Sequence, residues 1–414
     1  MSTPNPHIAI VGGGPAGLTL GLLLHKHSIP FTIFELRQRP TDEEFAQPSG
    51  SLDLHEESGL AAVKACDLFD EAMSLMGDCT EETKIADKEG NILYQDAGGL
   101  DRPEIYRHDL TKLFISHLPA DSIQWGHKLV GSKRIASSEI ELDFGKDGKH
   151  TFSFVVGADG AWSRVRPLLT DVKPHYAGFH NITISIRQIT TKHPELLALV
   201  GHGTFYSLAN KHGVFSQRAR HDSARMYIII SAEDKDFATS SGLASKTPSQ
   251  AKDVLLGDGA VLSQWGELIR QLVSVACEDE TAHNGGACVD IKPLYALPDG
   301  HSWEHCADAT LIGDAAHLTN PPAGEGVNIA MLDALLLSRA IVKAHEVAGG
   351  NLDAFVTALD SPVRDFEADM AGRAMALAEM TRMISGMMYG SEDGSRAMAD
   401  WFEEMMRGSV GVEG

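Results

Sequence analysis

Short apolar runs alternate with longer amphipathic stretches in the first third of the chain. Residues 7–11 form an apolar run that predicts a strand, residues 15–27 have helical periodicity, and residues 31–35 predict a second strand. A strand–helix–strand opening is typical of a parallel sheet with helices packed on its faces. The pattern therefore predicts an α/β fold with a doubly wound sheet.

The middle of the chain differs, because apolar and polar residues alternate there with a period of two in four short segments. These segments are residues 180–189, 203–208, 213–218 and 225–231. Such alternation is typical of an antiparallel sheet with one buried face. It predicts an inserted β-rich domain, since residues 310–312 and 326–348 return to the strand-then-helix pattern.

Longer helices are predicted elsewhere. The spacing of apolar positions indicates helices at residues 59–75, 249–278 and 362–388. The last of these carries many methionines, which adapt their shape to irregular contacts. We interpret it as a helix that bridges the two domains.

The composition narrows the function without identifying it. Of 414 residues, 43% are hydrophobic and 22% are charged, which is ordinary for a globular protein of two or three domains. With 35 Lys and Arg against 57 Asp and Glu, the net charge of −22 argues against nucleic acid as a partner, because phosphate binding needs a cationic face. No apolar run is long enough to predict a membrane span.

The cysteines are few and widely spaced, at Cys66, Cys79, Cys277, Cys288 and Cys306. Without a paired spacing they predict neither a disulfide framework nor a metal site. The chain also begins with a polar segment rather than a signal peptide. These features predict a cytoplasmic protein without a bound metal, and they leave the oligomeric state open, with a monomer plausible.

A glycine-rich turn follows the first predicted strand. Residues 12–17 read GGGPAG, the GxGxxG pattern in the strand–turn–helix context that dinucleotide binding requires. Gly12 permits the tight turn, Gly14 lets a pyrophosphate approach the backbone, and Gly17 lets the helix pack on the strand. Glu35 ends the next strand, where a carboxylate accepts a hydrogen bond from a ribose 2′-hydroxyl. The sequence therefore predicts a site for FAD or NAD rather than NADP.

Two later strings combine an Asp with neighbouring glycines. Residues 154–160 read FVVGADG and contain Asp159, a pattern that alone is also typical of a surface turn. Residues 311–328 read LIGDAAHLTNPPAGEGVN. Asp314 follows a strand there, where its carboxylate can bond a ribityl hydroxyl. The helix that begins near Gly326 directs its positive end toward an anion.

These three strings, in this order, resemble those of the class A flavoprotein monooxygenases, the family with the p-hydroxybenzoate hydroxylase fold. Residues 49–55 (SGSLDLH) and 103–110 (PEIYRHDL) are similar to segments of the tetracycline-inactivating FAD monooxygenases. In those enzymes the matching Asp and Arg contact FAD, and the resemblance implies that role for Asp53 and Arg107. The resemblance covers most of the chain.

The motifs and the resemblance together define two sets of site residues. The predicted FAD-binding residues are Gly12, Gly14, Ala16, Gly17, Glu35, Arg37, Asp53, Arg107, Asp159, Asp314, Gly324, Gly326, Val327 and Asn328. The predicted substrate-contacting residues are Thr183, His212, Phe215, Met226, Pro322 and Met375. An aromatic pocket floor could draw on Phe205, Tyr206, Phe215, Met226 and Tyr227, although alternation along a strand assigns about half of these to the domain core.

Several positions depart from the family pattern. The family usually has Gln where this chain has Glu325, before the last glycine of the third string. The substrate-facing strands of the tetracycline-inactivating members carry Gln, Arg and His, where this chain has Thr183, His212 and Met226. The Phe of their flavin-side loop corresponds to Pro322. We therefore expect FAD binding to be retained and the substrate pocket to differ.

The resemblance implies a monooxygenase for secondary metabolism or antibiotic modification. NADPH or NADH would reduce FAD, and O₂ would form a C4a-hydroperoxyflavin that hydroxylates an aromatic or polycyclic, polyketide-like or tetracycline-like small molecule. No second GxGxxG follows a strand, so the reductant is expected to dock transiently. No catalytic acid or base is assigned, although His212 and His317 are candidates.

Two other functions stay open at this point. One is another flavin oxidoreductase, such as an oxidase or a Baeyer–Villiger enzyme, and the other is a non-redox binding protein with an FAD fold. The Asp159 and Asp314 strings argue against the second, because a protein without redox chemistry has no need to hold a ribityl chain.

The predicted organisation has three parts. A discontinuous FAD-binding domain comprises residues 1–178 and 290–360, and an antiparallel β-rich substrate-binding domain comprises residues 179–289. The C-terminal helical region comprises residues 361–414 and contains the bridging helix.

Overall fold

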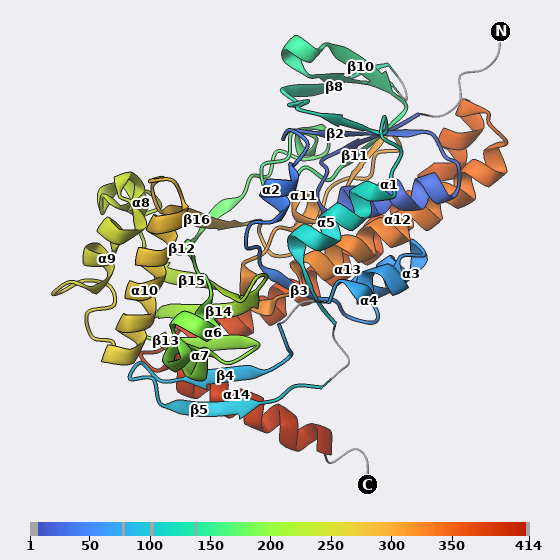
Figure 1. The fold of residues 1–414 in the computed structure, drawn as a ribbon. Coiled ribbons are helices and arrows are strands. Elements are labelled where there is room, and N and C mark those ends of the chain that lie inside the picture. Colours follow the sequence, from blue (N-terminus) through green and yellow to red (C-terminus); the bar gives the residue numbers. More distant parts are fainter. Residues whose placement is uncertain (1–6, 77–78, 100–102, 137–138, 411–414) are drawn as a thin grey trace.

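The computed structural model describes residues 7–76, 79–99, 103–136 and 139–410. The chain forms two lobes, one around a parallel sheet and one around a larger mixed sheet, and long C-terminal helices run along both (Figure 1). The predicted α/β class, with a β-rich lobe beside a doubly wound one, is confirmed. The first six residues of the predicted FAD-binding domain lie outside the described residues.

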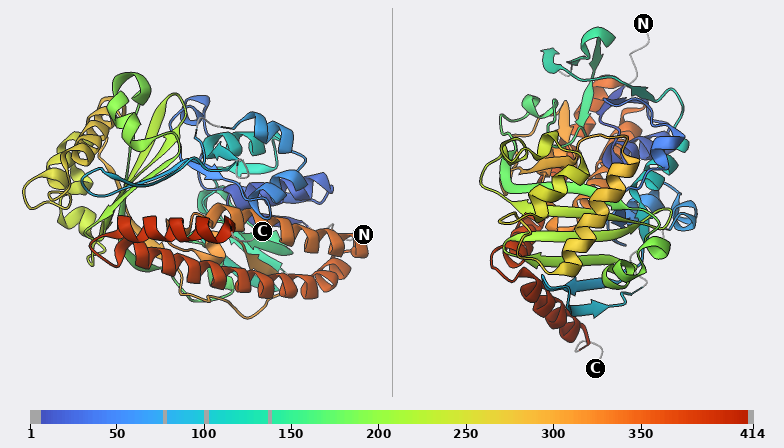
Figure 2. Two further views of the ribbon diagram at one scale, coloured as in Figure 1. Left: turned by 90° about the horizontal axis from the view of Figure 1, so that it is seen from below. Right: turned by 60° about the vertical axis from the view of Figure 1, so that its left-hand side comes forward.

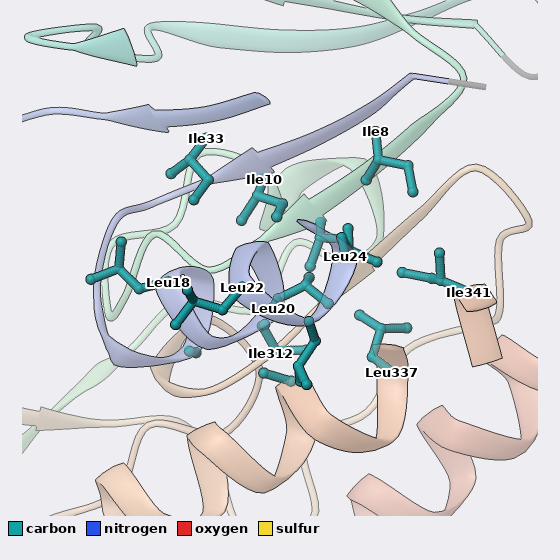
Figure 3. Close-up of a cluster of buried hydrophobic side chains, with 14 of the residues drawn as sticks. Ile8, Ile10, Leu18, Leu20, Leu22, Leu24, Ile33, Ile312, Leu337 and Ile341 are labelled. Atoms are coloured by element: carbon teal, nitrogen blue, oxygen red, sulfur yellow. The ribbon is translucent and has the colours of Figure 1, made fainter. Parts of the chain in front are cut away.

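The parallel sheet has the strand order β17-β11-β1-β2-β7, and every pairing in it is parallel. Its strands are β1 (Ile8–Val11), β2 (Phe31–Glu35), β7 (Ile123–Trp125), β11 (Phe154–Gly157) and β17 (Ala309–Leu311). Helices α1 (Pro15–Lys26) and α12 (Gly326–Ala348) pack against each other beneath it. Ile10, Leu20 and Leu337 meet in the core that these elements share (Figure 3).

Smaller elements surround this sheet. The remaining strands of the lobe are β3 (Ser51–Asp53), β6 (Glu104–Tyr106), β8 (Gly131–Ala136), β9 (Glu139–Asp143) and β10 (Lys149–Phe152). The shorter helices are α2 (Asp42–Phe45), α3 (Gly59–Ala65), α4 (Phe69–Ser74), α5 (Arg107–Ser116) and α11 (Asp314–His317). The single helix predicted at residues 59–75 is instead two helices, because Asp67 adopts a left-handed φ of +60° between them.

The mixed sheet has the strand order β16-β12-β15-β14-β13-β4-β5. Its strands are β4 (Thr83–Ala86), β5 (Ile92–Asp96), β12 (His175–Ile186), β13 (Thr204–Ala209), β14 (His212–Ala219), β15 (Ser223–Ser231) and β16 (Asp290–Ala296). All pairings are antiparallel except that of β13 with β4. The sheet therefore recruits β4, β5 and β16 from segments that the sequence assigned to the FAD-binding domain.

Helices cover one face of the mixed sheet. They are α6 (Ile189–Lys192), α7 (Pro194–Val200), α8 (Phe237–Ser240), α9 (Pro248–Leu256) and α10 (Glu267–His283). Helix α10 lies across the strands (Figure 2, right) and packs against β12. The helix predicted at residues 249–278 is thus divided, since α9 ends at Gly257 and a non-helical segment follows.

The C-terminal helices pack against the opposite face of the mixed sheet. Helix α13 (Leu352–Tyr389) contacts α12 in one lobe and β13 and β14 in the other, and α14 (Gly394–Val410) contacts β4, β5 and β13 (Figure 2, left). Helix α13 begins ten residues before the predicted start at Pro362, which it contains. Burial of Phe355 and Leu359 before that proline offsets the hydrogen bond that proline cannot donate. None of the helices in the described ranges is long and apolar enough to cross a membrane.

The two faces of the mixed sheet give a test of this packing. Phe205 is fully buried under the helices, whereas Phe215 lies on the other face and is half-buried. We expect Phe205→Ala to lower the free energy of unfolding by about 3–5 kcal/mol and Phe215→Ala to lower it clearly less. Urea denaturation followed by circular dichroism measures both, and equal losses would contradict the assignment of the faces.

Candidate functional site

The three strings recognised in the sequence leave the same edge of the parallel sheet. Val11, Gly157 and Leu311 are register partners at the carboxyl ends of β1, β11 and β17. Backbone hydrogen bonds continue past the strand ends, from Ala158 N–H to Val11 O (2.7 Å) and from Ile312 N–H to Gly157 O (2.9 Å). In open α/β sheets, ligands bind in a crevice at this edge.

The glycines of the first string have different surroundings. Gly12 has a φ of +111°, and a Cβ there would collide with the carbonyl oxygen of Ala158. A Cβ at Gly17 would collide with the carbonyl oxygen of Gly12, whereas a Cβ at Gly14 would meet nothing within 4 Å. Gly12 and Gly17 are therefore required by the fold. Gly14 borders open space at the start of α1, where backbone N–H groups are available to an anion.

Glu35 at the end of β2 is fixed by backbone donors. Its carboxylate accepts hydrogen bonds from the N–H of Gly13 at 2.6 Å and from the N–H of Arg37 at 2.8 Å. Each carboxylate oxygen keeps a second lone pair, so a ribose hydroxyl can still donate to it. The side chain of Arg37 is exposed beyond the strand end.

Asp159 mainly orders its own loop. Its Oδ2 accepts the Arg164 N–H at 2.6 Å, while its buried Oδ1 has no partner. Burial raises the pKa of this carboxyl. The neighbouring Gly160 borders open space. The second string therefore supplies a shaped loop and one unpartnered acceptor.

Arg166 links the second string to the third, a role that the sequence analysis missed. The side chain is 3% exposed, and it donates to the carbonyl oxygens of Ala315 (2.9 Å), Ala161 (3.0 Å) and Asp314 (3.3 Å). Three backbone acceptors around one guanidinium hold the two loops at a fixed separation. In the sequence, Arg166 is only the second Arg of the SRVR segment at residues 163–166, and nothing there marks its role.

Asp314 faces the crevice at the end of β17. Asp314 is exposed to solvent at its surface. The protein packed around it nevertheless raises the pKa of its carboxyl by burial, whereas the positive charges of His317, Arg107 and Arg166 lower that pKa. The Arg107 guanidinium therefore lies in the same site. The Arg107 N–H also donates to Gly50 O at 3.0 Å, which fixes the start of α5.

His317 and Asp333 support the third string from below. His317 Nε2 lies 2.6 Å from Asp333 Oδ2, and the same oxygen accepts the Gly313 N–H at 3.0 Å. Asp333 is fully buried, and Arg373 pairs with its other oxygen. Because His317 is held by this buried pair, its role is structural rather than that of an acid or base in the crevice. No pattern in the sequence marks Asp333 for this role, because it lies within an amphipathic helical stretch.

The start of α12 is open to a ligand. Gly324 has a φ of +73°, and a Cβ at Gly324 or Gly326 would meet nothing within 4 Å. The buried Asn328 donates its Nδ2–H to Asp53 O at 2.8 Å, and its Oδ1 accepts the His55 N–H at 3.1 Å. The predicted residues Asp53 and Asn328 are therefore brought together from distant parts of the chain.

These features fit an extended dinucleotide with a flavin ring. Open space borders Gly14, Gly160, Gly324 and Gly326, and the starts of α1 and α12 present free N–H groups to it. The carboxylates of Glu35 and Asp314 suit ribose and ribityl hydroxyls. Within the described ranges, no three His, Cys, Asp or Glu side chains are grouped so that they could hold a metal ion.

The predicted substrate residues divide between the two faces of the mixed sheet. Thr183 and Phe215 lie on the face toward the C-terminal helices, together with Tyr206 and Tyr227. Met226 is fully buried on the other face, within the core under α9 and α10. We therefore correct the prediction for Met226, because the period of two places its neighbour Tyr227, instead, on the face toward the C-terminal helices.

The other three predicted residues are dispersed. His212 accepts the Ser231 N–H at 3.1 Å through Nδ1, and burial lowers its pKa, so it holds the β14–β15 pair. Pro322 is half-buried in the turn before Gly324. Met375 is 40% exposed on α13.

Comparison with known proteins places this geometry in a family. Residues 6–253 and 308–355 match the family described as FAD binding domain. The chain is 32% identical to the monooxygenase penA of Penicillium thymicola, over 93% of this chain and 96% of that protein.

Solved structures share the fold. Klebsiella pneumoniae HpxO, in complex with FAD and uric acid, matches with a TM-score of 0.73 at 17% identity, over 96% of this chain and 92% of that one. The tetracycline destructase Tet(55) matches with a TM-score of 0.65 at 16% identity, over 92% of this chain and 90% of that one. The fold that the sequence resemblance implied is therefore confirmed.

The glycines of the first string separate folding from cofactor binding. We expect Gly14→Ala to leave the stability of the apoprotein unchanged and to weaken FAD binding by about tenfold, the effect of ~1.4 kcal/mol. Gly17→Ala should destabilise the apoprotein by about 1–3 kcal/mol, because its Cβ collides with Gly12 O. Thermal unfolding of the apoprotein and titration with FAD measure the two effects. Unchanged FAD affinity in Gly14→Ala would place the pyrophosphate elsewhere.

Proposed function

The chain belongs to the FAD binding domain family of monooxygenases, and from this premise we propose that it uses NADPH or NADH to insert one oxygen atom of O₂ into an aromatic or polycyclic small molecule. Its relatives are monooxygenases, so the non-redox binding protein is no longer retained as an alternative. One observation carries the proposal. Three strings converge at one sheet edge, beside the face of the mixed sheet that carries Thr183, Phe215 and Tyr227.

Different residues of the crevice would bind different parts of the cofactor. Gly14 and the start of α1 receive the pyrophosphate, Glu35 receives the adenosine ribose, and Asp314 receives the ribityl chain. The start of α12 receives the acceptor edge of the isoalloxazine ring, because its N–H groups are free. When bound, the flavin supplies hydride uptake and oxygen activation.

The substrate binds where the Thr183, Phe215 and Tyr227 face of the mixed sheet meets the loops that hold the cofactor. A Cβ at Gly50 would lie only 2.6 Å from Tyr227 Oη, so the loop before β3 is in direct contact with this face. The same loop accepts the Arg107 N–H and leads to Asp53. Burial raises the pKa of Tyr227, against the effect of Arg225, although the side chain keeps solvent-accessible surface. Tyr227 is therefore partly buried where this loop meets the sheet.

The chemistry of this face defines the class of substrate. Arg225 donates to Ser185 Oγ at 2.9 Å and bonds the phenol of Tyr227, which gives a polar end with cationic donors. Phe215 and Tyr206 form an edge-to-face pair, with centroids 5.3 Å apart, at the apolar end. A substrate with a planar aromatic body and a carbonyl or phenolic oxygen at one end matches both the apolar and the polar end of this face. The fully buried position of Met226 leaves it outside this set.

The reductant uses no domain of its own. No second glycine fingerprint follows a strand in the sequence, so the nicotinamide nucleotide docks transiently at the open crevice. Among the other flavin reactions, an oxidase would release H₂O₂ and a Baeyer–Villiger enzyme would form an ester or lactone. The product therefore distinguishes the three.

The reaction can be tested with a panel of phenols and tetracyclines in the presence of NADPH or NADH and oxygen-18 gas. We expect one member to stimulate reductant consumption and to gain one labelled oxygen atom as a hydroxyl group, measured by mass spectrometry and NMR. Hydrogen peroxide formation with an oxidised, unlabelled product and without consumption of NADPH or NADH would favour the oxidase, and a labelled ring ester would favour Baeyer–Villiger insertion.

The substrate face can be tested by paired variants. We expect Arg225→Gln and Phe215→Leu to raise the KM for substrate by about tenfold while the FAD content stays unchanged. Met226→Leu, on the opposite face, serves as the matched control and should leave KM unchanged. Steady-state kinetics and the flavin absorbance measure both properties. A loss of FAD in Arg225→Gln would assign that residue to the cofactor site instead.

A further inference from the structure

Glu325 stands at the N-cap of α12, the position whose side chain usually bonds the free N–H groups of the first turn. Its carboxylate makes no such cap. Instead, Glu325 Oε1 lies 2.9 Å from His55 Nδ1, and only a quarter of the side chain is exposed. The anionic group nearest the start of the helix is therefore turned away from it.

His55 joins two carboxylates. Its Nε2 lies 3.0 Å from Asp53 Oδ2 and its Nδ1 lies 2.9 Å from Glu325 Oε1, while the imidazole itself is 8% exposed. A neutral imidazole has one N–H, so it can donate to only one carboxylate, whereas the imidazolium donates to both. The hydrogen bonds from His55 to Asp53 and Glu325 raise its pKa to about 9, against the effect of burial.

The backbone fixes this bridge in place. Asn328, which is fully buried, accepts the His55 N–H and donates to Asp53 O. The segment from β3 is thereby tied to the first turn of α12 independently of the charges. His55 cannot move far from Glu325 while these hydrogen bonds of the Asn328 side chain hold.

Without the bridge, the Glu325 carboxylate would be attracted to the helix start. Unbonded N–H groups and the helix dipole favour a negative group there. The space beside Gly324 and Gly326 is open, so the side chain would meet no obstacle. A carboxylate in that space would occupy the place of the isoalloxazine acceptor edge and repel it.

We propose that His55 is a positioning residue that holds the Glu325 carboxylate away from the first turn of α12, so that the N–H groups of that turn stay available to FAD. The proposal rests on the FAD site described above. The negative charge of Glu325 is tolerated because His55 neutralises and restrains it.

The proposal predicts a pH dependence for FAD binding. The groups that face His55 are Asp53 on its own segment and Glu325 from α12, and Glu104 of β6 lies behind Asp53. Loss of the His55 proton near pH 9 leaves one N–H for two carboxylates and releases one of them. FAD affinity should therefore be constant below about pH 8 and fall as the pH rises through 9. Burial raises the pKa of Glu104 to about 7, so this carboxyl is already ionised when His55 loses its proton and does not contribute to the fall in affinity near pH 9.

The decisive experiment is a double-mutant cycle on the full-length apoprotein, read out as the dissociation constant of FAD from flavin fluorescence. We expect His55→Gln to weaken FAD binding by about tenfold at pH 7.5. Glu325→Gln in the same chain should restore most of the affinity, because the neutral amide no longer competes for the helix start. The double variant should also lose the fall in affinity near pH 9.

Controls separate the possible outcomes. His117→Gln removes a surface histidine that lies 2.9 Å from Glu71, and it should leave FAD affinity unchanged. Unchanged affinity in His55→Gln, or no recovery in the double variant while thermal unfolding shows intact apoprotein, would overturn the proposal. If the unchanged protein took up no FAD at any pH, the proposed function would fail instead.

Discussion

Pairing of three parallel strands, β1, β11 and β17, is the constraint on which the rest of the site depends. Their strings are separated by long stretches of chain: β4 and β5 of the mixed sheet lie between the first and the second, and its other five strands lie between the second and the third. Because parallel neighbours end at one edge, in-register pairing alone brings the loops together. Arg166 and Asp333 then set their spacing by bonding backbone groups on the second and third loops. The crevice is thus defined by main-chain geometry more than by the side chains that line it.

A chain with a net charge of −22 holds a nucleotide that is itself anionic. Local fields make this possible, because free N–H groups at the starts of α1 and α12 carry partial positive charge. Arg107 and Arg166 add full charges beside Asp314. Among the acidic residues of the crevice, Glu325 pairs with His55. Net charge therefore predicts the absence of extended polyanion partners but not the behaviour of one enclosed site.

The sequence predicted which loops converge at the sheet edge better than it predicted which residues of the mixed sheet share a face, for a physical reason. Gly12 and Gly17 are needed by local backbone geometry, which a short string records completely. Alternation along β15 shows that Met226 and Tyr227 lie on opposite faces of the sheet, but which of them joins the core depends on where α9 and α10 pack. Bonds such as that from Asn328 to Asp53, which join positions far apart in the chain, leave no local pattern. Helix breaks at Asp67 and Gly257 were missed because apolar spacing continues across them.

Helix α13 is one unbroken element of 38 residues, about 57 Å long. Phe355 and Phe366 anchor its first half in the core of the parallel-sheet lobe, and Ile384 and Met388 anchor its last turns against the mixed sheet. A single rod embedded in both lobes acts as a splint, so the lobes cannot swing apart as a hinged pair. A bulky substrate can then reach the interior only if small loops or the cofactor itself are displaced. The enzyme would therefore move locally, at its loops, while the two lobes keep their relative positions.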